Sequence, residues 1–177
     1  MIKAIIFDFG GVIIKDQYTK YVGVKTAEFQ LAEDYANKGE PPSQELSKVI
    51  EKLSPLTPQI YSSPDNQIIE LIKTLKLKYK VGLLSNNFTV WTQEAKKQEY
   101  MQLFDVAIFS SDVKLSKPGP KIYEYAAQQF GVKPFECVFI DNIEENVQGA
   151  RFVGMKGIWY KNFEQLIKDL NYYGVEI

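Results

Sequence analysis

The chain has no histidine, a single cysteine and no long apolar run. The absence of histidine excludes Ser-His-Asp and Cys-His catalysis and histidine-ligated metals. One cysteine allows neither a disulfide within the chain nor a multi-cysteine zinc site. Cys137 lies in an apolar run with Val138 and is interpreted as a core residue, with a reactive thiol as the alternative. Any chemistry therefore falls to carboxylates, lysines and hydroxyls.

Charge and hydropathy also limit the partners. The formal net charge is −1 and the lysines do not cluster, so we expect neither nucleic acid nor a membrane surface as a partner. The apolar run over residues 1–7 is too short for a signal peptide, and no segment has the length of a membrane span. With the single cysteine, these features favour a cytoplasmic protein.

Short apolar runs alternate with helix-like stretches, which is typical of a parallel sheet wrapped by helices. Their continuous apolar character suits strands buried on both faces. The predicted strands are 4–7, 81–84, 106–109, 138–140 and 157–160. We therefore predict an α/β fold with a doubly wound, mostly parallel sheet.

Three helices are predicted between or after these strands. The first covers 66–76, with Ser63-Pro64 as its cap and first turn. The second covers 120–130 and ends at Gly131. The third begins at a capping box, Asn162 to Gln165, and continues through Leu170.

Residues 16–62 interrupt the alternation, because they contain two helix-like pieces and no convincing strand. The pieces are 25–38, closed by Gly39, and 43–53, with Pro41-Pro42 between them. We interpret 16–62 as a small helical cap inserted after the first strand, and 1–15 with 63–177 as the core. The alternative is that these helices belong to the main layer.

Polar residues lie next to four of the predicted segments, three of them after a strand and one, Lys117-Pro118, before a helix. Ligands of open parallel sheets bind just beyond the carboxyl ends of the strands. The polar residues are Asp8, Ser85-Asn86-Asn87, Lys117-Pro118 and Asp141-Asn142. Four motifs occur in this order: Asp8-Phe9-Gly10-Gly11-Val12, Ser85, Lys117-Pro118 and Asp141. The gaps are 77 positions from Asp8 to Ser85, 32 from Ser85 to Lys117 and 24 from Lys117 to Asp141. This series resembles the four motifs of haloacid dehalogenase-like hydrolases, in their phosphatase branch.

The resemblance implies an enzyme that hydrolyses a small phosphorylated metabolite. Asp8 is implied to attack phosphorus and form an aspartyl phosphate, which water then cleaves. The implied catalytic residues are Asp8, Ser85, Lys117 and Asp141. Substrate is implied to bind Ser85, Asn86 and Lys117. Mg²⁺ is implied as the cofactor, held by Asp8, the Gly10 carbonyl and Asp141.

Four further positions near these motifs have a predicted role. For two of them a functional and a structural role are both open, and for the other two the role is structural. Asn142 and Glu145 either approach the metal indirectly or serve as a helix cap and a solvated first-turn acid. Asn87 is a candidate cap for the helix that follows it. Gly11, like Gly10, is expected to allow a tight turn and close approach of the backbone to phosphate.

Gly10 departs from the family pattern, because most phosphatases of the family have an aspartate there as general acid and base. Haloacid dehalogenases also lack that acid, which makes metal-independent dehalogenation the enzymatic alternative. Asp141, and the absence of arginine between Asp8 and Ser85, favour a phosphatase. A non-catalytic protein that binds a phosphorylated ligand is the third possibility. If the protein is an active phosphatase, Asp16 or another residue of the cap could replace the missing acid.

Overall fold

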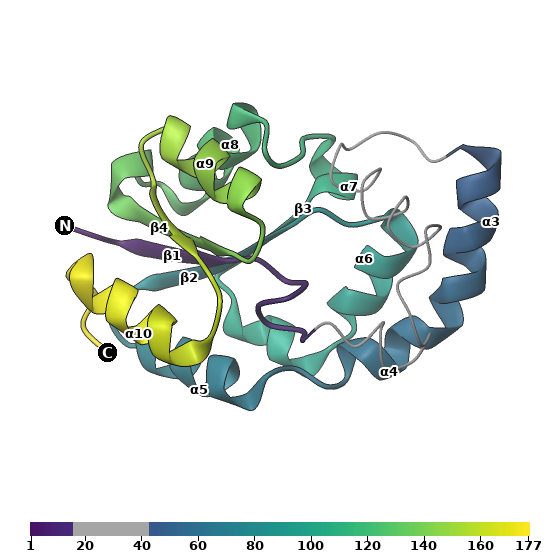
Figure 1. Cartoon of the computed structure of the whole chain (residues 1–177), viewed down its shortest axis with the longest axis horizontal. Coiled ribbons are helices and arrows are strands. Elements are labelled where there is room, and N and C mark those ends of the chain that lie inside the picture. The colour runs from purple at the N-terminus through teal and green to yellow at the C-terminus, as the bar shows by residue number, and fades with distance from the viewer. Residues whose placement is uncertain (16–42) are drawn as a thin grey trace.

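The computed structural model describes residues 1–15 and 43–177. Its five strands form one parallel sheet in the order β3-β2-β1-β4-β5 (Figure 1). The strands are β1 (Ala4–Phe7), β2 (Lys80–Ser85), β3 (Val106–Phe109), β4 (Cys137–Asp141) and β5 (Lys156–Trp159). The predicted strands are confirmed, although β2 and β4 are one residue longer at each end and β5 begins and ends one residue earlier than expected.

Helices connect the strands and lie on both faces of the sheet (Figure 1). The α-helices are α3 (Gln44–Leu53), α4 (Thr57–Tyr61), α5 (Asn66–Leu75), α6 (Thr89–Lys96), α7 (Ser110–Val113), α8 (Pro120–Phe130), α9 (Glu144–Phe152) and α10 (Phe163–Tyr172). Short 3-10 helices are η1 (Ser54–Leu56), η2 (Glu99–Leu103) and η3 (Pro134–Glu136). Within the described residues, no helix combines the length and hydrophobicity needed to cross a membrane.

Alternate residues of β1 contribute to two separate hydrophobic cores, because successive strand side chains point to opposite faces. Ile5 and Phe7 belong to the core that includes side chains of α5, α6 and α10. Ala4 and Ile6 belong to the core that includes side chains of α8 and α9. Both faces of the sheet are therefore covered, and the doubly wound fold is confirmed.

The helix ends agree with the sequence in part. Gly131 ends α8 in the left-handed conformation, as predicted. The cap predicted for α5 at Ser63-Pro64 is wrong, because Asp65 is the N-cap and its carboxylate accepts the Gln67 N–H at 2.9 Å. A carboxylate at this position also interacts favourably with the positive end of the helix.

Half of the capping box predicted for α10 is present. Asn162 is the N-cap, and its side-chain oxygen accepts the Gln165 N–H at 2.9 Å. The Gln165 side chain accepts from Lys161 N–H rather than from that of Asn162. The helix also extends to Tyr172, beyond the predicted end at Leu170.

The predicted cap lies mostly outside the described residues, which lack 25–38, Gly39 and Pro41-Pro42. The predicted helix at 43–53 is present as α3. Ile60 and Tyr61 of α4 are buried in the same core as β1. The division of the chain at residue 62 therefore stays a prediction.

The strand order places a topological switch at β1. The chain passes from β1 to β2 and β3 on one side, and later to β4 and β5 on the other. The connections that leave the carboxyl ends of β1 and β4 run in opposite directions. Ligands of doubly wound sheets usually bind in the crevice between two such connections.

Candidate active site

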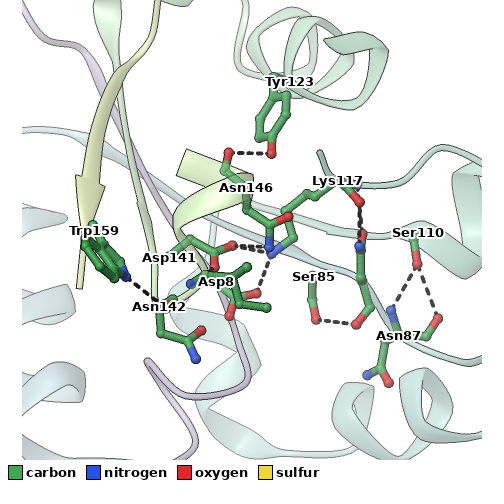
Figure 2. Close-up of polar contacts among 12 residues, drawn as sticks. Asp8, Ser85, Asn87, Ser110, Lys117, Tyr123, Asp141, Asn142, Asn146 and Trp159 are labelled. Carbon is green, nitrogen blue, oxygen red and sulfur yellow. Dashed lines mark hydrogen bonds and ion pairs between the residues drawn. The ribbon is translucent and has the colours of Figure 1, made fainter. Parts of the chain in front are cut away.

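The carboxyl ends of β1 and β4 bring two acidic side chains together. Asp8 follows β1 and Asp141 ends β4, and the strands pair with Phe7 opposite Ile140. The Nζ atom of Lys117 lies 2.6 Å from Asp8 Oδ1 and 2.7 Å from Asp141 Oδ2 (Figure 2). Three of the four predicted catalytic residues thus form one cluster.

This cluster is almost fully shielded from solvent. The exposed fractions of the side chains are 8% for Asp8, 2% for Lys117 and 0% for Asp141. Burial and the neighbouring Asp141 raise the pKa of Asp8 to about 7, although the Lys117 ammonium acts in the opposite direction. Burial alone would lower the pKa of Lys117, but Asp141 and Asp8 outweigh it and raise that pKa. Two carboxylates therefore share one ammonium.

Ser85, the fourth predicted catalytic residue, ends β2, the strand that pairs with β1 on the other side. Its side chain is buried, and its hydroxyl donates to the Asn86 carbonyl at 3.3 Å. Hydroxyl hydrogen bonds are usually about 2.7–2.8 Å long, so this contact is weak and can be exchanged for a better acceptor. The position suits the predicted contact with phosphate, which stays a prediction.

The two asparagines after Ser85 both bond within the protein. The Asn86 carboxamide contacts the main chain of Lys117 through both its oxygen and its nitrogen. The Asn87 carboxamide donates to the Tyr61 hydroxyl at 3.2 Å. The predicted capping role of Asn87 is wrong: the N-cap of α6 is Phe88, without a side-chain capping bond. Asn87 is instead turned toward α4.

The turn after β1 needs a glycine at one position only. Gly11 has φ +84°, and a Cβ atom there would lie 2.3 Å from the Asn142 side-chain nitrogen. The Gly11 N–H donates to the Ile14 carbonyl at 2.7 Å, which closes the turn. Gly10 is exposed, and a Cβ atom there would meet no atom within 4 Å. Neither packing nor backbone conformation therefore requires glycine at position 10.

The segment after β4 is turned by Asp141 rather than by Asn142. Asp141 Oδ1 accepts the Ile143 N–H at 2.8 Å. The capping alternative for Asn142 is wrong, because the N-cap of α9 is Ile143 and no side chain caps it. Glu145 is exposed in the first turn of α9. Indirect contact of Asn142 or Glu145 with a metal stays a prediction.

Asn146, a buried residue of α9, was not among the site residues predicted from the sequence. Its carboxamide donates to Asp141 Oδ2 at 3.1 Å, so that oxygen receives hydrogen bonds from both Asn146 and Lys117. The main-chain carbonyl of Asn146 in turn accepts a hydrogen bond from the Tyr123 hydroxyl at 2.7 Å. The available signal was spacing: an amide five positions after Asp141, in the first turn of a helix that follows this residue closely, can reach back to it.

The donor set fits a hard divalent cation. Two buried carboxylates and one ammonium leave a net negative charge when both acids are ionised. Burial, and then the charge of Asp141, raise the pKa of Asp8. Among residues 1–15 and 43–177, no group of three or more His, Cys, Asp or Glu side chains could hold a metal. Mg²⁺ commonly uses only one or two carboxylates and keeps several waters. Asp8 and Asp141 thus suffice as carboxylate ligands, with the Gly10 carbonyl as the predicted third.

Sequence comparisons identify related proteins. Residues 58–154 match the family model described as haloacid dehalogenase-like hydrolase. The glyceraldehyde 3-phosphate phosphatase of Pyrococcus furiosus is 30% identical over 105 residues, which are 58% of this chain and 43% of that protein. Phosphatase MT3486 of Mycobacterium tuberculosis is 35% identical over 79 residues, 44% of this chain and 36% of that protein. The matches thus span less than half the length of these relatives.

Solved structures share the fold over nearly the whole chain. A HAD family enzyme of Bacteroides thetaiotaomicron, solved as a magnesium complex, has a TM-score of 0.70 at 22% identity and is covered to 98%, against 94% of this chain. A dehalogenase solved with an intermediate complex has a TM-score of 0.65 at 19% identity, with coverage of 88% of this chain and 83% of that one. At these identities the likeness concerns the fold.

Proposed function

This chain belongs to the haloacid dehalogenase-like hydrolase family, and from that premise we propose that it is a Mg²⁺-dependent phosphatase with Asp8 as nucleophile. Its substrate is a small phosphorylated metabolite, as the similarity to phosphatases suggests. The observation that carries the proposal is the buried contact of Lys117 with both Asp8 and Asp141. It combines an acid suited to attack phosphorus with a positive charge suited to phosphate.

Lys117 serves two purposes in this proposal. Its ammonium opposes the rise in the Asp8 pKa, so that more of the carboxylate is ionised and nucleophilic at neutral pH. The same ammonium neutralises charge on the transferred phosphoryl group. The Ser85 hydroxyl donates to a phosphate oxygen after leaving the Asn86 carbonyl.

The reaction has two steps. The Asp8 carboxylate attacks phosphorus, the bond from phosphorus to the ester oxygen breaks, and an aspartyl phosphate forms. Water then attacks the phosphorus and releases inorganic phosphate and free Asp8. Asp8, Asp141 and the Gly10 carbonyl would hold Mg²⁺, which when bound would act as a Lewis acid and stabilise charge on the phosphoryl oxygens.

Gly10 sets the demand on the leaving group. With glycine at this position, the side chain that usually protonates the departing oxygen is absent. Aryl and acyl phosphates, whose leaving groups depart without a proton, should therefore react faster than alkyl phosphates. Sugar 1-phosphates should fall between them, because an anomeric oxygen leaves more readily than an ordinary alkoxide.

Dehalogenation is the competing activity, and Gly10 is the feature that favours it. A halide needs no proton as it leaves, so a dehalogenase also has no use for an acid at this position. Asp141 argues for the phosphatase, because its fully buried carboxylate lies beside Asp8 and Lys117, where it can bind a metal that a metal-independent dehalogenase would not need. A protein that only binds a phosphorylated ligand would need neither of the two buried acids.

The test is hydrolysis of p-nitrophenyl phosphate by the purified protein with Mg²⁺, alongside phosphorylated metabolites and 2-haloacids. We expect phosphate release that EDTA abolishes. Asp8→Asn should stop turnover with Mg²⁺ present, whereas Asp141→Ala should weaken Mg²⁺ binding measured by calorimetry. Asp112→Asn, the same change at an exposed acid, is the matched control and should leave turnover unchanged. Turnover retained in Asp8→Asn, or halide release without Mg²⁺, would overturn the proposal.

A further inference from the structure

Lys117 lies in a connecting segment, yet its ammonium must reach two fixed carboxylates. The segment joins α7, which ends at Val113, to α8, which begins at Pro120. Within the described residues, neither backbone group of Lys117 forms a hydrogen bond with another main-chain group. A lysine side chain has four rotatable bonds, so its position depends on what holds its backbone.

Asn86 holds that backbone at two points. Its side-chain oxygen accepts the Lys117 N–H at 3.0 Å, and its side-chain nitrogen donates to the Lys117 carbonyl at 2.9 Å. The two residues are 31 positions apart, and the contact joins the end of β2 to the segment before α8. A single hydrogen bond sets a distance, whereas a pair of bonds to one residue also sets its orientation.

The chain around Asn86 explains why this residue is well placed. Ser85 is the last residue of β2 and is buried in the sheet, so the residue after it starts from a fixed position. The carboxamide is short, with two dihedral angles, and both its polar atoms are engaged. Asn86 therefore holds the Lys117 main chain at a fixed place relative to the carboxyl end of β2.

We propose that Asn86 is a positioning residue that keeps the Lys117 ammonium between Asp8 and Asp141. This role differs from the direct binding of substrate predicted from the sequence. A substrate ligand acts on the affinity for substrate, whereas a residue that acts through Lys117 acts on the chemical step. A displacement of about 1 Å in such a group can lower the rate by about 10²-fold.

The first test follows Lys117 itself and requires no catalytic activity. Lysine amines are methylated with formaldehyde and a borohydride reagent, and the rate at Lys117 is read by peptide mass spectrometry. In the natural protein we expect slow labelling, because the Lys117 side chain is 2% exposed and its ammonium is bound to two carboxylates. In Asn86→Ala the rate at Lys117 should rise about 10- to 100-fold, the range expected from loss of two hydrogen bonds.

Two further variants keep this test interpretable. Asn87→Ala removes the neighbouring carboxamide, which contacts Tyr61 rather than Lys117, and should leave Lys117 protected. Asn86→Asp keeps the size and the oxygen that accepts from Lys117 N–H, but sets an oxygen against the Lys117 carbonyl. It serves if Asn86→Ala fails to fold, as judged by circular dichroism, and should also speed labelling. Labelling at the natural rate in a folded Asn86 variant would overturn the proposal.

The second test is kinetic and rests on the proposed phosphatase activity. With p-nitrophenyl phosphate, Asn86→Ala should lower kcat by about 10- to 100-fold and change KM by less than about threefold. A raised KM with unchanged kcat would instead assign Asn86 to substrate binding and overturn the positioning role. If the natural protein has no phosphatase activity, the proposed function fails, while the labelling of Lys117 still decides this inference.

Discussion

Replacing Lys117 by methionine tests the electrostatics of the cluster independently of any substrate. Lys117→Met keeps an unbranched side chain of similar length and removes the positive charge that faces Asp8 and Asp141. In the natural protein this charge lies 2.6 and 2.7 Å from carboxylate oxygens of the two acids. The variant therefore leaves two buried acids beside one another with no ammonium between them.

The magnitude follows from the burial of the cluster. Removing one partner of a buried ion pair costs about 3–5 kcal/mol of unfolding free energy, against about 0–1 kcal/mol for an exposed pair. We expect the larger range, because the side chains of Asp8 and Asp141 are 8% and 0% exposed. Without the ammonium, the folded variant binds protons at higher pH than the unfolded chain does. Its loss of stability is therefore greatest at neutral pH and becomes smaller as falling pH protonates the acids.

Urea denaturation in EDTA at about pH 5 and about pH 7.5 measures this cost. Lys73→Met is the matched control, because Lys73 also lies 2.7 Å from its partner, Glu70, but on the surface. The control should change the unfolding free energy by less than about 1 kcal/mol at either pH. A loss below about 1 kcal/mol for Lys117→Met at neutral pH, or an equal loss at both pH values, would show that the Lys117 charge does not stabilise the two buried acids.

Two further predictions concern Gly10 and Asp8. Gly10→Asp should raise kcat/KM for alkyl phosphates by up to about 10²-fold relative to aryl phosphates, since a Cβ atom at this position meets no neighbour within 4 Å. Equal effects on both ester classes, or a natural enzyme whose rates are insensitive to leaving-group pKa, would contradict the missing-acid interpretation. In EDTA, the melting temperature of the natural protein should fall relative to that of Asp8→Asn as pH rises from about 4 to about 7. The reason is that the raised pKa of Asp8 makes the folded state hold a proton that the unfolded state has released. Mg²⁺ should reverse this trend, and a constant difference between the two proteins across that range would count against the raised pKa.

Much of the core was predictable from local sequence. The buried strands are continuous apolar runs, and β1 is the clearest case, because Ala4 to Phe7 are all buried. Gly131 marks the end of α8 by a conformation that glycine adopts without steric cost. Such features depend on residues close together in the chain, so a pattern within one segment is enough to predict them.

The main members of the site were predictable from their order. Asp8, Lys117 and Asp141 each follow or precede a recognisable element, and parallel strands place their carboxyl ends at one edge of a sheet. Local rules failed where several donors or acceptors competed for one role. Asp65 caps α5 instead of Ser63, and Phe88 rather than Asn87 precedes α6, because tertiary contacts engage the Asn87 side chain elsewhere.

The sequence alone thus determined the strands, the sheet class and the acids and lysine that form the cluster. The partners of these residues depend on how the chain folds: Asn146 contacts Asp141, and Asn86 contacts the main chain of Lys117. The contact from Asn86 crosses 31 positions and depends on how the segment before α8 lies against the end of β2. A hydrogen bond requires its two atoms to meet within a few tenths of an ångström, and that geometry is set by packing of the whole domain rather than by any local pattern.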